Sequence, residues 1–299
     1  MLTMRHYQYH HLTTNGLMKN KKNKPNDSLA ILNGTLLNPV SGKEEKKNIY
    51  IRNGVIFFLP ERNVSYSEIN AEGLFIAPAL IDIHVHLREP GNEEDETISS
   101  GSTAAVKGGF GTVLAMPNTK PPVDSADMIL RIITRSSNNK IVRILPAGCL
   151  TEKREGRKKA KLIEMSKAGA MAFTDDGTTV HDNNLMRDIM FTLKALNKPL
   201  LDHAMDCRIA GDGVIRRGYL SRRLKLKEIP AAAEYKMVER DIALCKETGC
   251  RVHIQHISTF QSLQLLAEAQ RKGLPITAEA TPHHLLLCND DIKRDDANF

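Results

Sequence analysis

Two histidines one residue apart, His84 and His86, stand at the end of the apolar run 75–83. If that run is a β-strand, its period of two places both imidazoles on one face and Val85 on the other. At the carboxyl end of a strand in an α/β barrel, this face looks into the mouth where active sites lie. Imidazoles are common zinc ligands, so the pair predicts half of a zinc site.

More side chains of ligand type stand at the ends of three later apolar runs. Asp175 and Asp176 close one run, His203 closes the next, and His256 closes a third. Each residue alone is more often a core or loop group than a ligand, but their regular placement together favours a metal site. More than four candidates indicate two metal ions, about 3.5–4 Å apart and bridged by a carboxylate. His253 is the less favoured alternative to His256 on the same run.

The spacing of the apolar runs predicts the scaffold that positions these residues. From residue 74 onward, strand-like runs alternate with helical stretches, which is typical of a parallel sheet. The expected strands are 75–85, 111–116, 141–147, 170–173, 199–202, 251–257 and 275–280. The expected helices are 97–107, 125–136, 158–168, 183–196, 231–248 and 259–272. Eight strands would close a (β/α)8 barrel, so we expect an α/β barrel over 76–299 that ends before its eighth strand.

The N-terminal part has a different pattern. Residues 1–28 are polar and lack periodicity, which predicts a disordered tail, and either Met1 or Met18 is a possible start. Residues 29–75 hold strand-like segments between Asn-Gly and Ser-Gly turn signals, which predicts a small β domain. Its expected strands are 28–32, 48–52 and 55–59.

Composition excludes several classes of protein. With 41% hydrophobic residues among 299, the chain is not wholly disordered, and no apolar run reaches the roughly 20 residues of a membrane helix. The net charge is +7, but the basic residues form separate stretches without interleaved aromatic residues, which argues against nucleic acid. The five cysteines lack Cys-x-x-Cys spacing and no signal peptide precedes them, so we expect a cytoplasmic protein without a disulfide framework.

Four segments resemble one enzyme family. Residues 79–91, Ala-Leu-Ile-Asp-Ile-His-Val-His-Leu-Arg-Glu-Pro-Gly, are similar to the first-strand signature of cyclic amidohydrolases, especially dihydroorotases and allantoinases. Met-Pro-Asn-Thr at 116–119, the segment 169–177 ending in Thr-Asp-Asp-Gly, and Ile-Pro-Ala-Ala-Ala-Glu at 229–234 resemble dihydroorotases specifically. The resemblance covers about residues 29–299 and is closest to the long, class I bacterial dihydroorotases of the amidohydrolase superfamily.

The resemblance implies a metal role for five residues. His84 and His86 would bind the first zinc ion, and His203 and His256 the second. Asp176 would bridge the two ions, at a position where many relatives use a carbamylated lysine. We therefore expect two zinc ions per subunit.

The resemblance also implies substrate-binding residues. Arg88 and Asn118 match the family's binders of the substrate carboxylate, and His86 would contact the substrate as well. The planar fork of an arginine suits a carboxylate. The plainer alternatives are an ion pair of Arg88 with Glu89 or Glu96, and a turn role for Asn118.

The activity implied is the reversible, zinc-dependent cyclisation of N-carbamoyl-L-aspartate to L-dihydroorotate in pyrimidine biosynthesis. An allantoinase or hydantoinase activity and a non-catalytic dihydroorotase-like partner of aspartate transcarbamoylase remain alternatives. The expected partners are the small-molecule substrate, a second copy in a homodimer and aspartate transcarbamoylase, with no nucleic acid and no membrane. The family's catalytic Asp lies on the eighth strand, which would follow Phe299, so we expect an inactive fragment and assign no catalytic residue within it.

Overall fold

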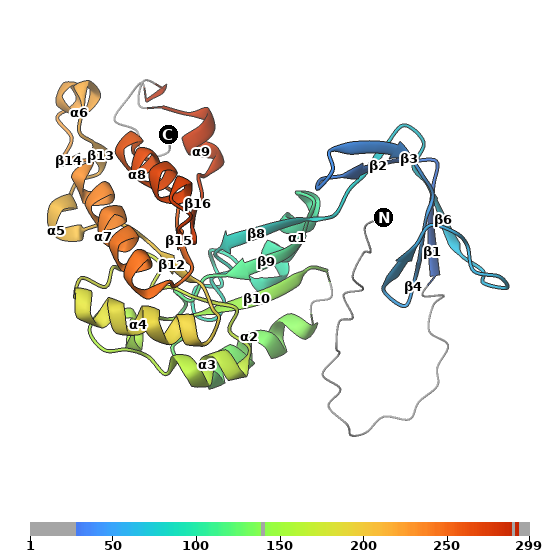
Figure 1. Ribbon diagram of the computed structural model, residues 1–299, viewed down its shortest axis with the longest axis horizontal. Coiled ribbons are helices and arrows are strands. Elements are labelled where there is room, and N and C mark those ends of the chain that lie inside the picture. The colour runs from blue at the N-terminus through green and yellow to red at the C-terminus, as the bar shows by residue number, and fades with distance from the viewer. Residues whose placement is uncertain (1–27, 139–140, 289–290, 293–299) are drawn as a thin grey trace. The chain divides into compact units, whose positions relative to one another are not determined.

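The computed structural model describes residues 28–138, 141–288 and 291–292 (Figure 1). The chain divides into two compact units, Met1–Pro78 and Ala79–Phe299. The predicted disordered tail lies outside the described residues, except for Ser28, which begins the first strand. Within the described ranges, no helix combines the length and the apolar character needed to span a bilayer.

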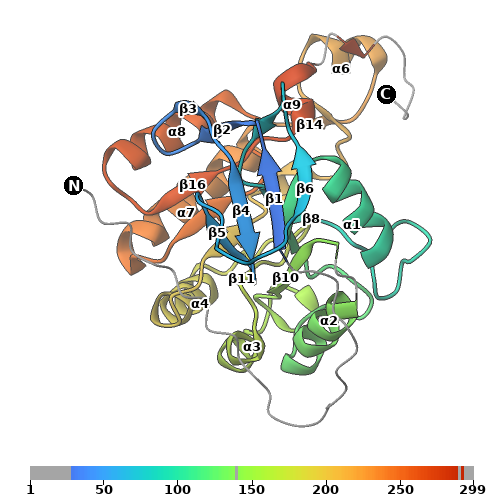
Figure 2. The same ribbon diagram turned by 90° about the vertical axis from the view of Figure 1, so that its right-hand side faces the viewer.

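The first unit contains two small sheets. In one, β1 (Ser28–Leu32) lies between antiparallel β4 (Ile49–Arg52) and parallel β6 (Ser67–Asn70), with β5 (Val55–Phe57) outside β4 (Figure 2). In the other, β2 (Thr35–Asn38) pairs with β3 (Lys43–Lys46) and β7 (Phe75–Ile76). The sequence predicted β1, β4 and β5 but not β2, β3 or β6. The Lys-Glu-Glu-Lys segment of β3 is wholly exposed and has no apolar face to detect.

The run 75–85, predicted as a single strand, is two strands in the structure. Its first residues form β7 in the first unit, and β8 (Leu80–Val85) begins the sheet of the second unit. Pro78 lies between them, and proline has no N–H to donate to a strand ladder. The prediction of one continuous strand was therefore wrong.

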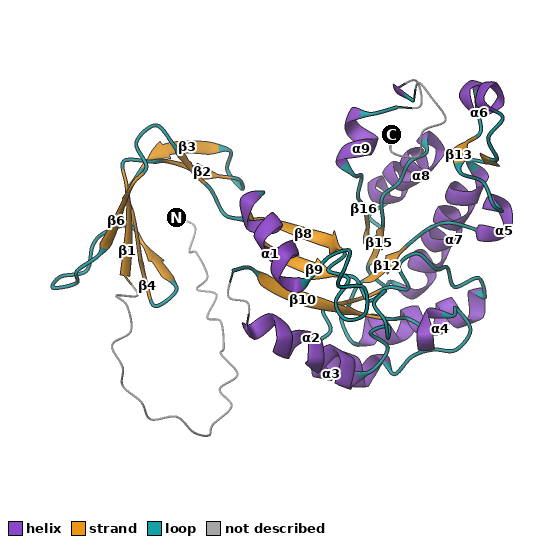
Figure 3. Ribbon diagram, turned by 180° about the vertical axis from the view of Figure 1, so that it is seen from behind, coloured by secondary structure: helices purple, strands orange, loops and turns teal. Residues whose placement is uncertain are grey.

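Seven parallel strands form the sheet of the second unit, in the order β16-β15-β12-β11-β10-β9-β8 (Figure 3). After β8 they are β9 (Phe110–Ala115), β10 (Arg143–Gly148), β11 (Ala172–Phe173), β12 (Leu200–Asp202), β15 (Val252–Ile254) and β16 (Ile276–Ala278). In the part of the chain that the structure describes, β8 and β16 each pair on one side only. The arrangement is an incomplete α/β barrel, which confirms the predicted fold class.

Helices connect most of these strands. They are α1 (Ile98–Lys107), α2 (Ala126–Asn138), α3 (Leu162–Ala168), α4 (Asn183–Ala195), α7 (Ala232–Thr248) and α8 (Phe260–Arg271). All six were predicted, but α3 begins four residues later than expected. The reason is that the N–H of Ala160 and the carbonyl of Lys158 bond to Leu150 and Glu152 and are not available to a helix.

Six short elements of the second unit were not predicted, because they are too short to show a period. They are η1 (Glu152–Arg154), α5 (Cys207–Ala210), β13 (Ile215–Arg216), α6 (Tyr219–Leu224), β14 (Glu228–Ile229) and α9 (Pro282–Leu286).

The main core anchors the strand ends that carry the candidate ligands. Phe173, Leu200 and Ile254 belong to β11, β12 and β15 and are completely buried in this core. Each lies two or three residues before a candidate ligand, Asp176, His203 or His256. Apolar burial of the strands therefore fixes where the polar residues that follow them are placed.

Glu234 of α7 is a buried carboxylate that holds the start of α8. Its two oxygens accept hydrogen bonds from the backbone N–H groups of Ser258 and Thr259, at 2.9 and 3.0 Å, and from both hydroxyls. Burial by itself would raise the pKa of Glu234. The hydrogen bonds from Ser258 and Thr259 have the larger effect, so the pKa lies below its ordinary value. The ionised Glu234 carboxylate therefore stabilises the fold at any pH above the ordinary glutamate pKa. This stabilisation is lost as the pH falls through the lowered pKa.

We expect Glu234→Ala to lower the free energy of unfolding by about 3 kcal/mol, because it removes a buried acceptor of four hydrogen bonds, two of them from the buried Thr259. Glu239→Ala is the matched control, since Glu239 lies on the same helix and is exposed; it should change stability by less than about 0.5 kcal/mol. Chemical denaturation of both variants measures the difference. Equal midpoints and slopes for the two would contradict the role given to Glu234.

Candidate metal centre

Four histidines from three strands form one cluster. His84 in β8 and His86 just after it have ring centroids 5.3 Å apart, on the same side of the strand. His203 follows β12 and His256 follows β15, and their centroids lie 4.7 Å apart. The centroids of His84 and His256 lie 5.4 Å apart, so the two pairs are neighbours.

Asp176 lies among these histidines. Its Oδ1 is 3.4 Å from Nε2 of His84 and 3.8 Å from Nδ1 of His203, and its Oδ2 is 3.5 Å from Nε2 of His86. Burial by itself would raise the pKa of Asp176. The hydrogen bond with His84 and the charges of the three histidines have the larger effect, so the pKa lies below its ordinary value. An ionised carboxylate that faces both pairs has the arrangement of a bridging ligand.

The neighbouring carboxylate, Asp175, points away from the cluster. It accepts hydrogen bonds from the backbone N–H groups of Leu150 and Thr151, at 2.8 and 3.1 Å, and from the Thr151 hydroxyl. Burial raises the pKa of Asp175 to about 6 in spite of these bonds. The structure therefore directs Asp176, and not Asp175, toward the histidines.

Two side chains hold the outer nitrogens of the β8 histidines. Asn118 has its Oδ1 3.0 Å from Nδ1 of His86 and donates from Nδ2 to Oδ2 of Asp176 at 2.9 Å. Glu279 bonds Nδ1 of His84 through its Oε1. Both histidines are thereby turned so that Nε2 faces Asp176. Metal-binding histidines are commonly oriented in this way by a carbonyl or carboxylate on the other nitrogen.

The sequence analysis missed Glu279. This residue follows β16, and its Oε1 also lies 3.3 Å from the backbone N of His256. Burial lowers the pKa of His84, but the carboxylates of Asp176 and Glu279 outweigh it and raise the pKa to about 9. Hydrogen bonds from His253 and His84 outweigh the effect of burial on Glu279 and lower its pKa to about 2. The sequence did offer one signal for Glu279. It follows the seventh strand, just as the other candidate ligands follow earlier strands.

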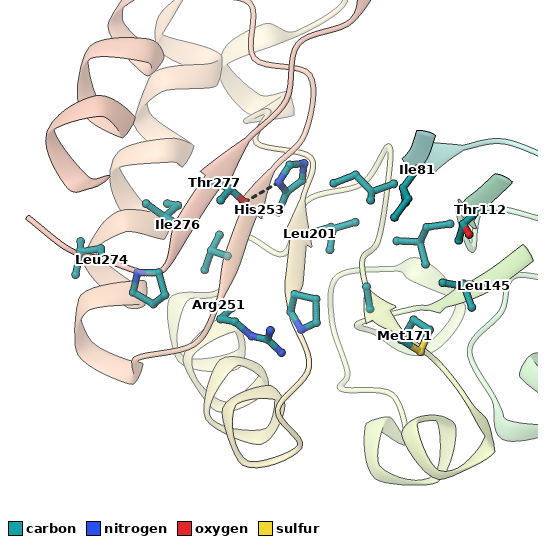
Figure 4. A pocket seen from close by; sticks show the side chains of 16 residues that line it. Ile81, Thr112, Leu145, Met171, Leu201, Arg251, His253, Leu274, Ile276 and Thr277 are labelled. Carbon is teal, nitrogen blue, oxygen red and sulfur yellow. Dashed lines mark hydrogen bonds between the residues drawn. The ribbon is translucent and has the colours of Figure 1, made fainter. Parts of the chain in front are cut away.

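The structure places His253 outside the cluster. Its Nδ1 lies 2.8 Å from Oγ1 of Thr277 (Figure 4). Its Nε2 lies 3.1 Å from Oε2 of Glu279. His256, in contrast, has its Nε2 3.1 Å from Nδ1 of His203. Its backbone φ of 31° lies in the left-handed region, a strain that is found preferentially at functional sites.

A cavity of about 540 Å³ lies on the inner face of the sheet (Figure 4). Its lining is mostly apolar and includes Pro199, Arg251 and Leu274, which precede β12, β15 and β16. The histidine cluster stands at the opposite, carboxyl ends of the strands. His253 also lines the cavity, but its ring nitrogens are engaged by Thr277 and Glu279, so we place the chemistry at the cluster.

The donor set of the cluster fits zinc. Ligand atoms of His84, Asp176 and His256 all lie within 4.8 Å of one another. Two nitrogens bound to one tetrahedral zinc at 2.0–2.1 Å lie about 3.3 Å apart, close to the 3.1 Å between the facing nitrogens of His203 and His256. Imidazole nitrogen and carboxylate oxygen are ordinary zinc ligands.

Comparison with known proteins decides the family. Residues 73–262 match the family model described as Dihydro-orotase-like. The chain belongs to the dihydro-orotase-like family. This confirms the family that the sequence motifs indicated.

Curated relatives of this dihydro-orotase-like chain are named dihydroorotases. This chain is 42% identical to the dihydroorotase of Anoxybacillus flavithermus over 231 residues. The aligned part makes up 77% of this chain and 54% of the relative. The chain is also 42% identical over 273 residues to that of Carboxydothermus hydrogenoformans, covering 91% and 63%. The chain thus spans between 54% and 63% of the length of these two relatives.

Solved structures share the fold of the dihydro-orotase-like chain. The L-hydantoinase of Arthrobacter aurescens aligns with a TM-score of 0.72 at 22% identity, over 88% of this chain and 60% of that one. A D-hydantoinase from Thermus sp. aligns with a TM-score of 0.68 at 22% identity, over 87% and 58%. At this identity the likeness shows the barrel fold and no more.

Arg88 has no competing ion-pair partner in the described part of the dihydro-orotase-like chain. Glu89 pairs with Arg135 at 2.7 Å, and Glu96 accepts a hydrogen bond from Ser100. Burial, together with the charges of Arg88 and His84, lowers the pKa of His86. Arg88 also has a positive φ of 55°. A cation held in a strained backbone beside His86 suits the binding of an anionic group.

Proposed function

We propose that this chain carries the metal site of a dihydroorotase, which cyclises N-carbamoyl-L-aspartate reversibly to L-dihydroorotate. The observation that carries the proposal is the position of Asp176 between the two histidine pairs at the carboxyl ends of the strands. Membership of the dihydro-orotase-like family supports the choice of substrate.

Five residues would hold two zinc ions. His84 and His86 would bind one, His203 and His256 the other, and Asp176 would contact both. When bound, the ions would activate a water molecule and polarise the ring amide carbonyl. Glu279 would orient His84, and Asn118 would orient His86 and Asp176.

Arg88 would bind a carboxylate of the substrate through two parallel hydrogen bonds from its planar guanidinium. Asn118 and His86 are proposed as further substrate contacts. Asn118 uses one N–H of Nδ2 for Asp176 and has its Oδ1 at His86, so its second N–H can still donate to a substrate carboxylate.

The test of the function compares two forms of the protein. One is the 299-residue chain, and the other is the same chain extended with the C-terminal segment of the Anoxybacillus flavithermus relative. We expect about two zinc ions per chain and hydrolysis of L-dihydroorotate by the extended form. Turnover of allantoin or hydantoin without dihydroorotate would overturn the proposal.

Metal content distinguishes the proposed enzyme from the third alternative, a non-catalytic partner of aspartate transcarbamoylase. Absence of bound zinc together with no turnover in either form would favour that alternative, because a non-catalytic partner can dispense with the metal. Light scattering of the chain, alone and mixed with aspartate transcarbamoylase, tests the predicted homodimer and the predicted contact.

In the extended form, we expect Arg88→Lys to lower kcat/KM for dihydroorotate by about 10- to 150-fold, mainly through KM, and to leave the zinc content unchanged. Lysine keeps the charge but loses the bidentate fork, and hydrogen bonds to charged groups contribute about 1.5–3 kcal/mol. Arg131→Lys, at an arginine of α2, is the control and should change neither quantity. Unaltered steady-state kinetics of Arg88→Lys would remove Arg88 from the substrate site.

A further inference from the structure

A thiol and an imidazole meet at the surface, outside the histidine cluster. Sγ of Cys207 lies 3.2 Å from Nε2 of His181. Cys207 is exposed, and the His181 side chain is 28% exposed. On the other side of the ring, Oδ1 of Asp206 lies 3.9 Å from Nδ1 of His181. A nucleophile, a base and a carboxylate therefore stand in sequence, as in enzymes that activate a thiol.

The environment of His181 suits a ring that accepts a proton. In the described part of the chain, its Nδ1 is buried and has no hydrogen-bond partner. When Nε2 takes up the thiol proton, the ring becomes a cation with a proton on Nδ1 that faces Asp206. The hydrogen bond from Arg208 lowers the pKa of Asp206 to about 2, so this carboxylate stays ionised. Asp206, Arg208 and His181 are the charged or titratable groups that face the thiol.

We propose that Cys207 is a thiol–disulfide exchange site that reacts with low-molecular-weight disulfides, with His181 as its general base. Nε2 of His181 takes the Sγ proton as Sγ attacks one sulfur of the disulfide. A new S–S bond forms, the original one breaks, and the imidazolium returns the proton to the leaving thiolate. The Cys207 sulfur is oxidised and the leaving sulfur is reduced, so no other oxidant is needed.

The site joins the two segments that carry Asp176 and His203. His181 lies on the segment after β11, and Cys207 lies on the segment after β12. Thr179 joins the same segments, since its Oγ1 lies 3.0 and 2.7 Å from the carbonyl oxygens of His203 and Met205. A group attached to Sγ must displace the contact with His181 and so disturb this junction. This consequence for the metal centre rests on the proposed function, whereas the exchange chemistry does not.

The other cysteines provide internal controls. Cys149, Cys245 and Cys250 are buried, and burial raises the pKa of each thiol. Cys288 is exposed like Cys207, but no imidazole contacts its thiol within the described residues. Cys288 is therefore the matched comparison, an accessible thiol without a base.

The experiment exposes the full chain to limiting glutathione disulfide and follows each cysteine by peptide mass spectrometry. We expect Cys207 to react at least about tenfold faster than Cys288, which is below the 10²–10⁴-fold typical of general bases in enclosed sites. His181→Gln should reduce the Cys207 rate to that of Cys288. Equal rates for the two cysteines in the unaltered chain would overturn the proposal without the need for any variant.

A second measurement tests the coupling to the metal centre. After removal of free glutathione, the modified chain should bind zinc several-fold more weakly, and dithiothreitol should restore its affinity. Cys207→Ser should bind zinc normally before and after the same treatment. Unchanged zinc affinity in the modified chain would overturn the coupling, because the zinc measurement does not depend on catalytic activity.

Discussion

If the proposed function holds, replacing Asp176 with alanine in the extended form is expected to abolish the binding of both zinc ions and to reduce dihydroorotate turnover by about 10³-fold or more. The carboxylate is the group that faces His84, His86 and His203 together. Its loss removes the proposed bridging ligand and leaves three imidazoles to repel each other when protonated. Metal activation of water and of the carbonyl contributes several kcal/mol, which corresponds to this loss of rate.

Asp175→Ala is the matched control for this prediction, because it alters the adjacent carboxylate. Its expected effect is on folding, since three donors from Leu150 and Thr151 lose their acceptor. We expect the free energy of unfolding to fall by about 3 kcal/mol, with zinc binding retained by the folded protein. Zinc analysis and denaturation of both variants separate the two roles. If Asp175→Ala loses zinc while Asp176→Ala keeps it, the assignment is reversed.

The scaffold was predictable because its signals are local. An apolar run followed by a polar ligand-type residue recurs along the chain, and each such run supplies one strand of the seven-stranded sheet, although the run 75–85 divides into β7 and β8. Phe173, Leu200 and Ile254 illustrate this, since their burial needs only an apolar residue at the right position in a strand. The pairing of His84 with His86 likewise follows from the period of two in a strand.

The contacts that orient the ligands were not predictable in this way. Glu279 bonds His84 across 195 positions of sequence, and Asn118 contacts Asp176 across 58. Periodicity carries no information on which distant side chains meet. The position of Glu279 near the end of the predicted strand 275–280 marks it as a candidate site residue, but it does not show that Glu279 contacts His84. Such residues become visible only when the sheet brings the strand ends together.

Substitutions can distinguish a residue that binds metal from one that orients a ligand. His84→Ala is expected to remove a ligand, so zinc content should fall to about one ion or less per chain and turnover should be lost. Glu279→Gln keeps a group of similar size but loses the charge that holds Nδ1 of His84. We therefore expect Glu279→Gln to retain the zinc stoichiometry and to weaken zinc affinity by about 10- to 100-fold, as for other outer partners of metal-binding histidines.

Competition with a zinc chelator measures this difference in affinity, and metal analysis measures stoichiometry. His283→Ala, at an exposed histidine of α9, is the control and should match the unaltered chain in both. His253→Gln should have a smaller effect than Glu279→Gln, because among the described residues His253 bonds Glu279 and does not contact His84 directly. If Glu279→Gln instead lost zinc as completely as His84→Ala, Glu279 would be a metal ligand and not an orienting residue. If His84→Ala kept its zinc, the cluster around Asp176 would not be the metal centre.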